Sequence, residues 1–396
     1  MIVIGGTYRE RSLHPNIDQL AGSGLRAALT VLRQDPSSTL VTAVAEAEHE
    51  AVEASVNGYG LSTRLLRRSQ PIEFRYFTPL DTPAIVGRES SLVDNHPVEG
   101  PSVLRFGMVE GVVPVTADVV VVDPQQPVGL TGDPFVEVTA DRRGLVLNLT
   151  EATQLLAHAT GPADAARELL TTFDCDAVVV KNGPRGAAIA ERGTTETAIV
   201  RPHWSDRVAP LGTGDVFSAA FTYGWASGKP ATEAAEWASS CVAQYAAGED
   251  VAPPPQLPAA TEPVPVNEAK VYLAGPFFTL GECWLVELCR NALAPHVFSP
   301  LHDVGRGVNV AKADIDGLEQ CDSVLALVDG DDPGTLFEVG WARARDIPVV
   351  AYAVQPNPEG RKMVEELGGE VIDDLSTAVY RSVWHAMRRR QHDSDR

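Results

Sequence analysis

The sequence has few cysteines and no long apolar run, the features that would indicate a disulfide-rich or a membrane protein. Only 5 of its 396 residues are cysteines, and none of them forms a Cys-x-x-Cys pair. An odd number of widely spaced cysteines argues against a disulfide framework or a zinc site and favours a reducing compartment. No apolar run approaches the ~20 residues of a membrane-spanning helix, and Met1 to Gly6 do not start a signal peptide. We therefore expect a cytoplasmic protein without a membrane partner.

Basic residues are also scarce. The chain has 32 Lys and Arg against 53 Asp and Glu, a formal net charge of −21. Such a surface repels the phosphates of nucleic-acid polymers and anionic lipids. A local set of backbone N–H groups can still bind a small anion. Small molecules are therefore the expected partners.

The length and one proline-rich stretch predict two domains. A chain of this length is too long to fold around a single hydrophobic core. Residues 252–268 contain six prolines. We expect a first domain over 1–250, a linker over 251–268, a second domain over 269–390 and a disordered tail over 391–396. An ordered proline-rich loop packed on one domain is the alternative to a linker.

Both domains are predicted to be three-layer α/β/α folds with mainly parallel sheets. Apolar runs such as Val119–Val122 and Ala177–Val180 alternate with helical stretches such as Ala163–Thr172, and the pattern continues after the linker. Nearly continuous apolar strands are typical of parallel sheets covered on both faces. Ligands of such sheets bind at the carboxyl ends of the strands.

In the second domain, an apolar strand ends in an acidic loop at Leu327–Asp332, and Pro333-Gly334-Thr335 then opens a helix that carries Glu338. Thr335 and Glu338 also have the Thr-x-x-Glu spacing of a capping box, which needs no catalytic role. Asp329 and Asp331 are equally compatible with a solvated acidic turn.

This segment, together with Tyr272-Leu273-Ala274-Gly275-Pro276-Phe277-Phe278 and Asp314, resembles the nucleoside 2-deoxyribosyltransferase family, which includes nucleotide N-hydrolases. The resemblance covers about 270–352 and implies a flavodoxin-like fold and a homo-oligomer. It implies roles for seven residues: Glu338 as nucleophile, Asp332 as the acid that contacts the base, Asp314 near the sugar, Tyr272 orienting the nucleophile, and Gly275, Pro276 and Phe277 binding substrate. Carboxylates suit cleavage of an N-glycosidic bond, because one can capture C1′ covalently while a second, if protonated, assists the departing base. Transfer to a second base and hydrolysis both remain open.

In the first domain, Pro210-Leu211-Gly212-Thr213-Gly214-Asp215 leads into an alanine-rich helix. Backbone N–H groups at such a helix start can bind an anion, and Asp215 could act as a general base. The alternative is that Asp215 only caps the helix.

The first domain contains two further motifs besides the segment Pro210 to Asp215: the strand and turn Val178 to Ala187, and Asn148-Leu149-Thr150-Glu151. Together the three features resemble the ribokinase-like (PfkB) carbohydrate and nucleoside kinases over about 119–247. The resemblance implies ATP and Mg²⁺ as cofactors, an anion hole at Gly212, Thr213 and Gly214, a nucleotide-side turn at Gly183 and Gly186, and an indirect magnesium role for Asn148 and Glu151. Asn148 and Glu151 also have the spacing of a helix cap.

The first domain departs from the family pattern at Ala209, Pro210 and Thr213, which stand where the signature has Asp, Thr and Ala. Gly22-Ser23-Gly24-Leu25-Arg26 resembles the family's sugar-binding stretch only loosely. Two hypotheses follow. The chain is a bifunctional enzyme of nucleoside or nucleotide metabolism with an active sugar or nucleoside kinase domain, or it carries a degenerate kinase-like module that binds a ligand and regulates an N-glycohydrolase of nucleotides or NAD-type substrates.

Overall fold

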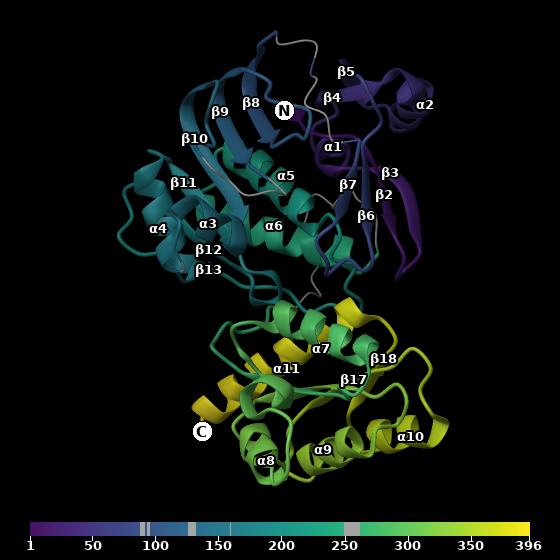
Figure 1. Cartoon of the computed structure of the whole chain (residues 1–396). Coiled ribbons are helices and arrows are strands. Elements are labelled where there is room, and N and C mark those ends of the chain that lie inside the picture. Colours follow the sequence, from purple (N-terminus) through teal and green to yellow (C-terminus); the bar gives the residue numbers. More distant parts are fainter. Residues whose placement is uncertain (88–91, 93–95, 126–131, 159, 249–261) are drawn as a thin grey trace. The chain divides into compact units, whose positions relative to one another are not determined.

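The computed structural model describes residues 1–87, 92, 96–125, 132–158, 160–248 and 262–396 (Figure 1). These residues form two compact units. Unit 1 comprises Met1–Ser205 and Ala209–Glu262, and unit 2 comprises Asp206–Val208 and Pro263–Arg396. Most of the predicted linker lies outside the described residues. Its last part, from Pro263 on, belongs to unit 2, and Val264 is fully buried there.

Unit 1 is built on a large sheet of nine described strands. Their spatial order is β13-β12-β11-β10-β9-β8-β1-β4-β5, and all neighbours are parallel except the β11–β12 and β12–β13 pairs. The strands are β1 (Ile2–Ile4), β4 (Thr39–Ala45), β5 (Ser62–Arg68), β8 (Val98–Phe106), β9 (Val115–Asp123), β10 (Val138–Asn148), β11 (Ala177–Lys181), β12 (Ala187–Glu191) and β13 (Ala198–Val200).

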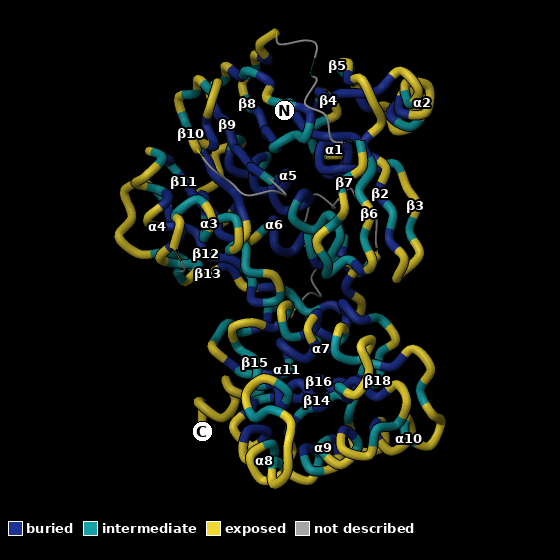
Figure 2. The backbone as a smooth tube through the Cα atoms, in the orientation of Figure 1, coloured by how far each residue is buried: buried dark blue, intermediate teal, exposed yellow. Residues whose placement is uncertain are grey.

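Helices cover both faces of this sheet. Successive residues of β9 face opposite sides, so Val121 joins one hydrophobic core and Val120 the other. The first core packs against α1, α2, α5 and α6, and the second against α3 and α4. The helices are α1 (Ser23–Leu32), α2 (His49–Tyr59), α3 (Leu149–Leu156), α4 (Pro162–Thr172), α5 (Thr213–Ala226) and α6 (Ala231–Ala246), with short 3-10 turns at Glu46–Glu48 and Gly183–Arg185. Figure 2 shows that α5 is buried along most of its length.

A second, smaller sheet of unit 1 stands beside α1. Its order is β3-β2-β6-β7, with strands β2 (Tyr8–Ser12), β3 (Ile17–Ala21), β6 (Glu73–Tyr76) and β7 (Ala84–Val86). Glu10, near the middle of β2, is buried. This strand therefore carries a carboxylate into the interior of unit 1.

Unit 2 has a five-stranded parallel sheet in the order β15-β14-β16-β17-β18. This is the 2-1-3-4-5 strand order of flavodoxin-like folds. The strands are β14 (Val271–Ala274), β15 (Val297–Phe298), β16 (Ser323–Leu327), β17 (Val349–Tyr352) and β18 (Glu370–Ile372). The helical segments are α7 (Leu280–Leu293), a π-helical turn at Pro300–Val304, α8 (Ala311–Glu319), α9 (Pro333–Arg343), α10 (Pro358–Glu366) and α11 (Leu375–Ser394).

The predicted fold class is confirmed, but two boundary predictions need correction. The expected disordered tail from residue 391 is wrong for its first part, because α11 continues to Ser394. The unit boundary is also not a single cut, since Asp206–Val208 belong to unit 2. There the backbone N–H of Val208 donates to Thr377 Oγ1 (3.0 Å), and Arg381 forms an ion pair with Asp206 (3.1 Å).

Within the described part of the chain, every helix is too short or too polar to cross a membrane.

Candidate functional site

In unit 2, the sheet and helix α9 bring two predicted site residues into contact. Tyr272 lies in β14 and is fully buried, and its hydroxyl donates to Glu338 Oε1 at 2.7 Å. Burial raises the pKa of Glu338 to about 7; the hydrogen bond from Tyr272 lowers it, and Asp314 and Asp332 raise it. Burial and the neighbouring Glu338 carboxylate raise the pKa of Tyr272. Tyr272 is therefore a hydrogen-bond donor to Glu338 at neutral pH.

The cap of α9 is Asp332, and the alternative capping box of Thr335 and Glu338 is wrong. Asp332 Oδ2 accepts from the backbone N–H and the hydroxyl of Thr335, at 2.7 and 2.8 Å. Pro333 occupies the first turn, where its missing N–H costs no hydrogen bond. The helix therefore starts before Thr335, and the Glu338 side chain is bound to Tyr272 instead of to the helix start.

The other candidate acids of unit 2 divide into two groups. Asp314, in the first turn of α8, has a buried Oδ1 without a hydrogen-bond partner in the described structure, and burial raises its pKa. Asp329 instead accepts from the backbone N–H groups of Val354 and Gln355, and Asp331 accepts from Asn357. Asp314 thus keeps an unused acceptor oxygen, whereas Asp329 and Asp331 stabilise the loop.

The loop after β14 contains the predicted substrate-binding residues Gly275, Pro276 and Phe277. A Cβ on Gly275 would lie 3.0 Å from a methyl carbon of Leu327, so this glycine lets the loop pack closely on β16. The loop ends at α7, where Thr279 and Glu282 form a capping box. The backbone hydrogen bonds of that cap lower the pKa of Glu282, whereas Asp332 acts to raise it.

In unit 1, α5 starts at the predicted anion hole, but its first donors are partly used. Gly212 has φ +84° and is the N-cap residue. Both the N–H and the hydroxyl of Thr213 donate to the carbonyl of Pro210, at 3.1 and 2.8 Å. Thr213 therefore uses both donors to close a tight turn. They would otherwise be able to bind an incoming anion.

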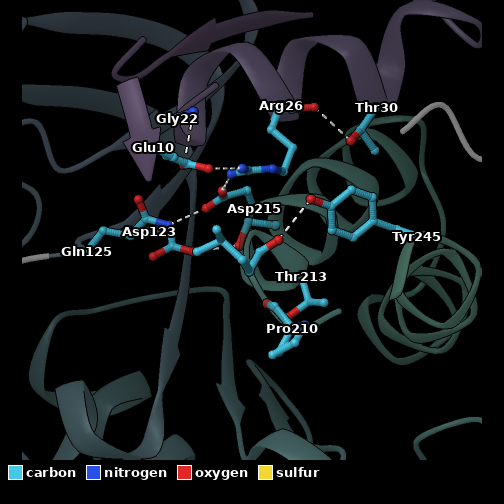
Figure 3. A network of polar contacts seen from close by, with 12 residues as sticks. Glu10, Gly22, Arg26, Thr30, Asp123, Gln125, Pro210, Thr213, Asp215 and Tyr245 are labelled. Atoms are coloured by element: carbon cyan, nitrogen blue, oxygen red, sulfur yellow. Dashed lines mark hydrogen bonds and ion pairs between the residues drawn. The ribbon is translucent and has the colours of Figure 1, made fainter. Parts of the chain in front are cut away.

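Asp215 lies in the first turn of α5 as predicted, but it does not cap the helix. Arg26 Nη1 donates to Asp215 Oδ2 and Gln125 Nε2 donates to Asp215 Oδ1, each at 2.5 Å (Figure 3). Arg26 also binds Glu10 Oε2 at 2.6 Å through Nη2. Burial raises the pKa of Asp215, whereas Arg26 and Gln125 act to lower it.

This Arg26–Asp215 network is buried and tightly fitted. The side chains of Arg26, Glu10 and Asp215 are only 5%, 7% and 8% exposed. A Cβ on Gly212 would lie 2.2 Å from Arg26 Nε, so only a glycine at this position leaves room for the arginine. Both carboxylate oxygens of Asp215 are engaged in this structure.

A second charged cluster lies at the carboxyl ends of β9 and β11. Lys181 Nζ donates to Asp123 Oδ2 at 2.8 Å, and the Ser218 hydroxyl donates to the same oxygen at 2.6 Å. Burial disfavours the ammonium, but Asp123 and Glu151 outweigh it and raise the pKa of Lys181. A Cβ on Gly214 would lie 3.3 Å from Lys181 Nζ. Lys181 is therefore a fixed cation beside the start of α5.

Asn148 and Glu151 form the capping box of α3, as their spacing allows. Asn148 Oδ1 accepts from Glu151 N at 2.9 Å, and Glu151 Oε2 accepts from Asn148 N at 2.8 Å. Burial and then Asp123 raise the pKa of Glu151 to about 7. Among the residues that the structure describes, no group of three or more His, Cys, Asp or Glu is arranged to hold a metal.

Two carboxylates of these clusters offer oxygens that suit a magnesium ion. Mg²⁺ in phosphoryl-transfer sites is usually held by one or two carboxylates together with water and substrate phosphates. Asp123 Oδ1 is buried without a partner in the described structure, and the capping box leaves Glu151 Oε1 unused. Asp123 and Glu151 are the residues that would hold the ion, together with the nucleotide.

A tight glycine turn is present at Gly183 and Gly186, where the sequence predicted one. Gly183 has φ +54° and Gly186 has φ +75°, and a Cβ on Gly186 would lie 2.1 Å from the carbonyl oxygen of Val200. The turn closes with Asn182 N donating to Gly186 O at 2.7 Å. A glycine is therefore required at position 186 for the turn to pack against β13.

Sequence reasoning did not predict roles for six residues of the unit 1 clusters: Glu10, Arg26, Asp123, Gln125, Lys181 and Ser218. Lys181 and Asp123 end apolar strands, and a charged residue at the carboxyl end of a buried strand was the signal that could have found them. Arg26 gave no such signal, because its partner Asp215 lies 189 positions away in the chain.

The comparisons with known proteins identify one family for each unit. Residues 271–373 match the model of the family described as nucleoside 2-deoxyribosyltransferase, and residues 116–254 match that of the pfkB family carbohydrate kinases. A search among curated proteins finds no match.

Several solved structures resemble the chain at low identity. A pyrophosphate-dependent kinase of the ribokinase family, complexed with a pyrophosphate analog and myo-inositol, is 14% identical, with 64% of this chain and 97% of that chain covered and a TM-score of 0.45. Ribokinase from Thermotoga maritima is 15% identical, with 62% and 92% covered and a TM-score of 0.45. The tetrameric inhibited form of phosphofructokinase-2 from Escherichia coli is 12% identical, with 63% and 95% covered and a TM-score of 0.46. The two family matches by themselves show that the chain is a fusion of a PfkB-type carbohydrate-kinase domain and a nucleoside 2-deoxyribosyltransferase-type domain.

Proposed function

We propose that unit 2 breaks the N-glycosidic bond of a nucleoside or nucleotide, with Glu338 as nucleophile. The supporting observation is the 2.7 Å hydrogen bond from buried Tyr272 to Glu338. The Glu338 carboxylate attacks C1′ and forms a C1′–O bond, while the C1′–N bond breaks and its electron pair leaves with the base. Tyr272 keeps one carboxylate oxygen fixed, so the other faces the sugar.

Three further groups complete this reaction. Asp332 Oδ2 already accepts hydrogen bonds at the start of α9. Asp332 Oδ1 is therefore the oxygen that contacts the departing base and the proton on that base. Asp314 Oδ1 accepts from a sugar hydroxyl, which satisfies its buried oxygen. In the second step, water or a second base attacks C1′ and the C1′–O bond to Glu338 breaks, which restores the carboxylate. The proton that the attacking group loses balances the electron pair that the first base took with it. The resulting activity is hydrolysis or base exchange, respectively.

The test is product analysis of the purified protein with a panel of nucleosides and nucleotides, with and without a free second base. We expect a released base, or an exchanged one when the second base is present, and loss of several orders of magnitude in rate for Glu338→Gln. Near wild-type turnover of a folded Glu338→Gln protein would refute the assignment.

For unit 1 we propose ATP- and Mg²⁺-dependent phosphoryl transfer to a hydroxyl of a sugar or nucleoside, with Asp215 as general base. The start of α5, the Lys181 cation and the Asp123 and Glu151 carboxylates support this proposal. The Asp215 carboxylate takes the acceptor proton. Because Arg26 and Gln125 occupy both of its oxygens, one of these bonds opens when the acceptor binds.

The occupied Asp215 also favours a second candidate function. If the Arg26–Asp215 pair stays closed, unit 1 is a ligand-binding module that regulates unit 2. Calorimetry with ATP and Mg²⁺, followed by a screen for ADP release with sugars and nucleosides, separates the two. ADP release that Asp215→Asn abolishes supports the kinase; nucleotide binding without turnover supports the module.

We further propose that the protein is a cytoplasmic homo-oligomer. Phe278, Leu280 and Phe337 of unit 2 are 73%, 87% and 58% exposed, and exposed apolar side chains of this size are typical of protein contacts. All five cysteines are free, as expected in a reducing compartment. Light scattering after size-exclusion chromatography should give a multiple of the 42.3 kDa chain mass; a monomer would contradict the proposal.

A further inference from the structure

The short segment 206–208 is held on α11 of unit 2 by a buried hydrogen bond and an exposed ion pair. Val208 is 2% exposed, and its backbone N–H donates to Thr377 Oγ1 at 3.0 Å. Arg381 reaches Asp206 at 3.1 Å, but the Asp206 side chain is 97% exposed. An ion pair that is open to water contributes little. The hydrogen bond to Thr377 is therefore the stronger of the two contacts.

This segment continues directly into the start of α5. The chain passes from unit 2 to unit 1 between Val208 and Ala209. The connection, residues 209–211, then leads to Gly212, the N-cap residue of α5. Three residues span at most about 10 Å when fully extended. A connection this short can absorb a displacement of Val208 only if it has slack.

The connection has little slack, because hydrogen bonds within unit 1 hold each of its three residues. The N–H of Ala209 donates to the carbonyl of Ala246 at 2.8 Å. The carbonyl of Pro210 accepts from the first residue of α5, and the ring of Pro210 fixes its φ. The carbonyl of Leu211 accepts from the Tyr245 hydroxyl at 2.8 Å (Figure 3). The course of the connection therefore determines where the N–H groups at the start of α5 lie.

We propose that Thr377 of unit 2 is a positioning residue for the proposed anion site at the start of α5 in unit 1. By fixing Val208, it holds the connection in the course that the N–H groups of this site require. The identity of the ligand rests on the proposed phosphoryl-transfer function of unit 1. The coupling itself needs no ligand, and it acts in both directions: a change at either end of the connection alters the other end.

Two variants at position 377 separate the bond to Val208 from the packing of α11. Thr377→Val keeps the shape of the side chain but leaves the Val208 N–H without its acceptor. Thr377→Ser retains a hydroxyl, which can accept from Val208 and donate to Asp374 Oδ1, as the Thr377 hydroxyl does at 2.6 Å. The control is Ser382→Ala, which removes another buried hydroxyl of α11, one that donates to the carbonyl of Val379.

Hydrogen exchange of the full chain, followed by mass spectrometry, provides a readout without ligand. The amides of Ala209 and Thr213 are hydrogen-bonded within unit 1, so a purely local role of Thr377 in unit 2 would leave their exchange unchanged. We expect them to exchange about tenfold faster in Thr377→Val. Thr377→Ser and Ser382→Ala should show the wild-type rate at both amides. Unchanged exchange at both amides in Thr377→Val would overturn the inference.

The reverse perturbation is made in unit 1 and measured in unit 2. Tyr245→Phe removes the hydroxyl that holds Leu211 and adds no atoms. It should speed exchange of the Val208 amide, and a wild-type rate there would contradict the coupling. This variant also decides the question if Thr377→Val fails to fold.

Calorimetry with ATP and Mg²⁺ tests the consequence for the ligand. Thr377→Val should raise the Kd about tenfold, and Thr377→Ser should restore it. An equal Kd for wild type and Thr377→Val would overturn the inference while leaving the proposed function standing. If the wild-type protein binds no ATP, the proposed function of unit 1 is refuted, and the two exchange measurements alone decide the inference.

Discussion

Replacing Glu338 by Gln should stabilise the protein at alkaline pH and leave its stability unchanged at acid pH. The folded-state pKa of Glu338 is about 7, against an ordinary value of 4.5. Below pH 4.5 the carboxyl is neutral in both the folded and the unfolded state. As the pH rises from 4.5 to 7, the unfolded chain loses this proton before the folded one, so the free energy of unfolding falls. Gln removes this penalty, and its side-chain oxygen can still accept from Tyr272.

The size of the effect follows from the pKa difference. At 1.36 kcal/mol per pH unit the penalty is roughly 3 kcal/mol, and partial exposure of the side chain reduces it to roughly 2 kcal/mol. For a unit of this size the thermal midpoint should rise by about 5 to 10 °C.

Calorimetric scans of the full chain at pH 4.5 and pH 8 measure this difference directly. Glu365→Gln is the control, since Glu365 is an exposed partner of Arg361 on α10. A Glu338→Gln midpoint equal to or below wild type at pH 8, or the same rise at both pH values, would refute the electrostatic description of the site.

Three further predictions concern the two sites and the unit boundary. Tyr272→Phe removes a hydrogen bond that lowers the pKa of Glu338, so the acid limb of the pH–rate profile should move up by about one pH unit. An acid limb that does not move would exclude a role of Tyr272 in activating Glu338. Arg26→Gln leaves buried carboxylates unpaired, so the free energy of unfolding of unit 1, measured with denaturant at pH 7, should fall by about 3 to 5 kcal/mol. A loss below about 1 kcal/mol would show that the Arg26–Asp215 pair is not maintained in solution. A segment starting at Pro263 lacks residues 206–208 and should melt a few degrees below unit 2 of the full chain; equal midpoints would contradict their assignment to unit 2.

Local patterns in the sequence were sufficient to predict the fold class. The apolar runs at Val119–Val122 and Ala177–Val180 form β9 and β11, and the stretch at Ala163–Thr172 forms most of α4. Strands buried on both faces have an unbroken apolar signature, which sequence analysis detects reliably. The helix ends were less predictable. Asp332, and not Thr335, caps α9, and α11 continues into the predicted tail as far as Ser394.

The candidate sites were predictable only where a short motif carries the chemistry. Tyr272 and Glu338 were paired in advance by resemblance, and their hydrogen bond joins positions 66 residues apart. The Arg26–Asp215 pair was not predicted, because no local spacing reports a contact between α1 and α5. The pair bears on the proposed kinase activity, since Arg26 engages the residue that we propose as its general base. Long-range ion pairs of this kind emerge from packing, not from periodicity.

The central claim is that Glu338 attacks C1′, and trapping the glycosyl–enzyme intermediate tests it most directly. The protein is mixed with a cleavable nucleoside or nucleotide, quenched in acid within the first turnovers, digested and examined by mass spectrometry. We predict a sugar adduct on the peptide that contains Glu338, formed with the burst of released base and absent from Glu338→Gln. Base release without any adduct, together with undiminished turnover by Glu338→Gln, would contradict the claim.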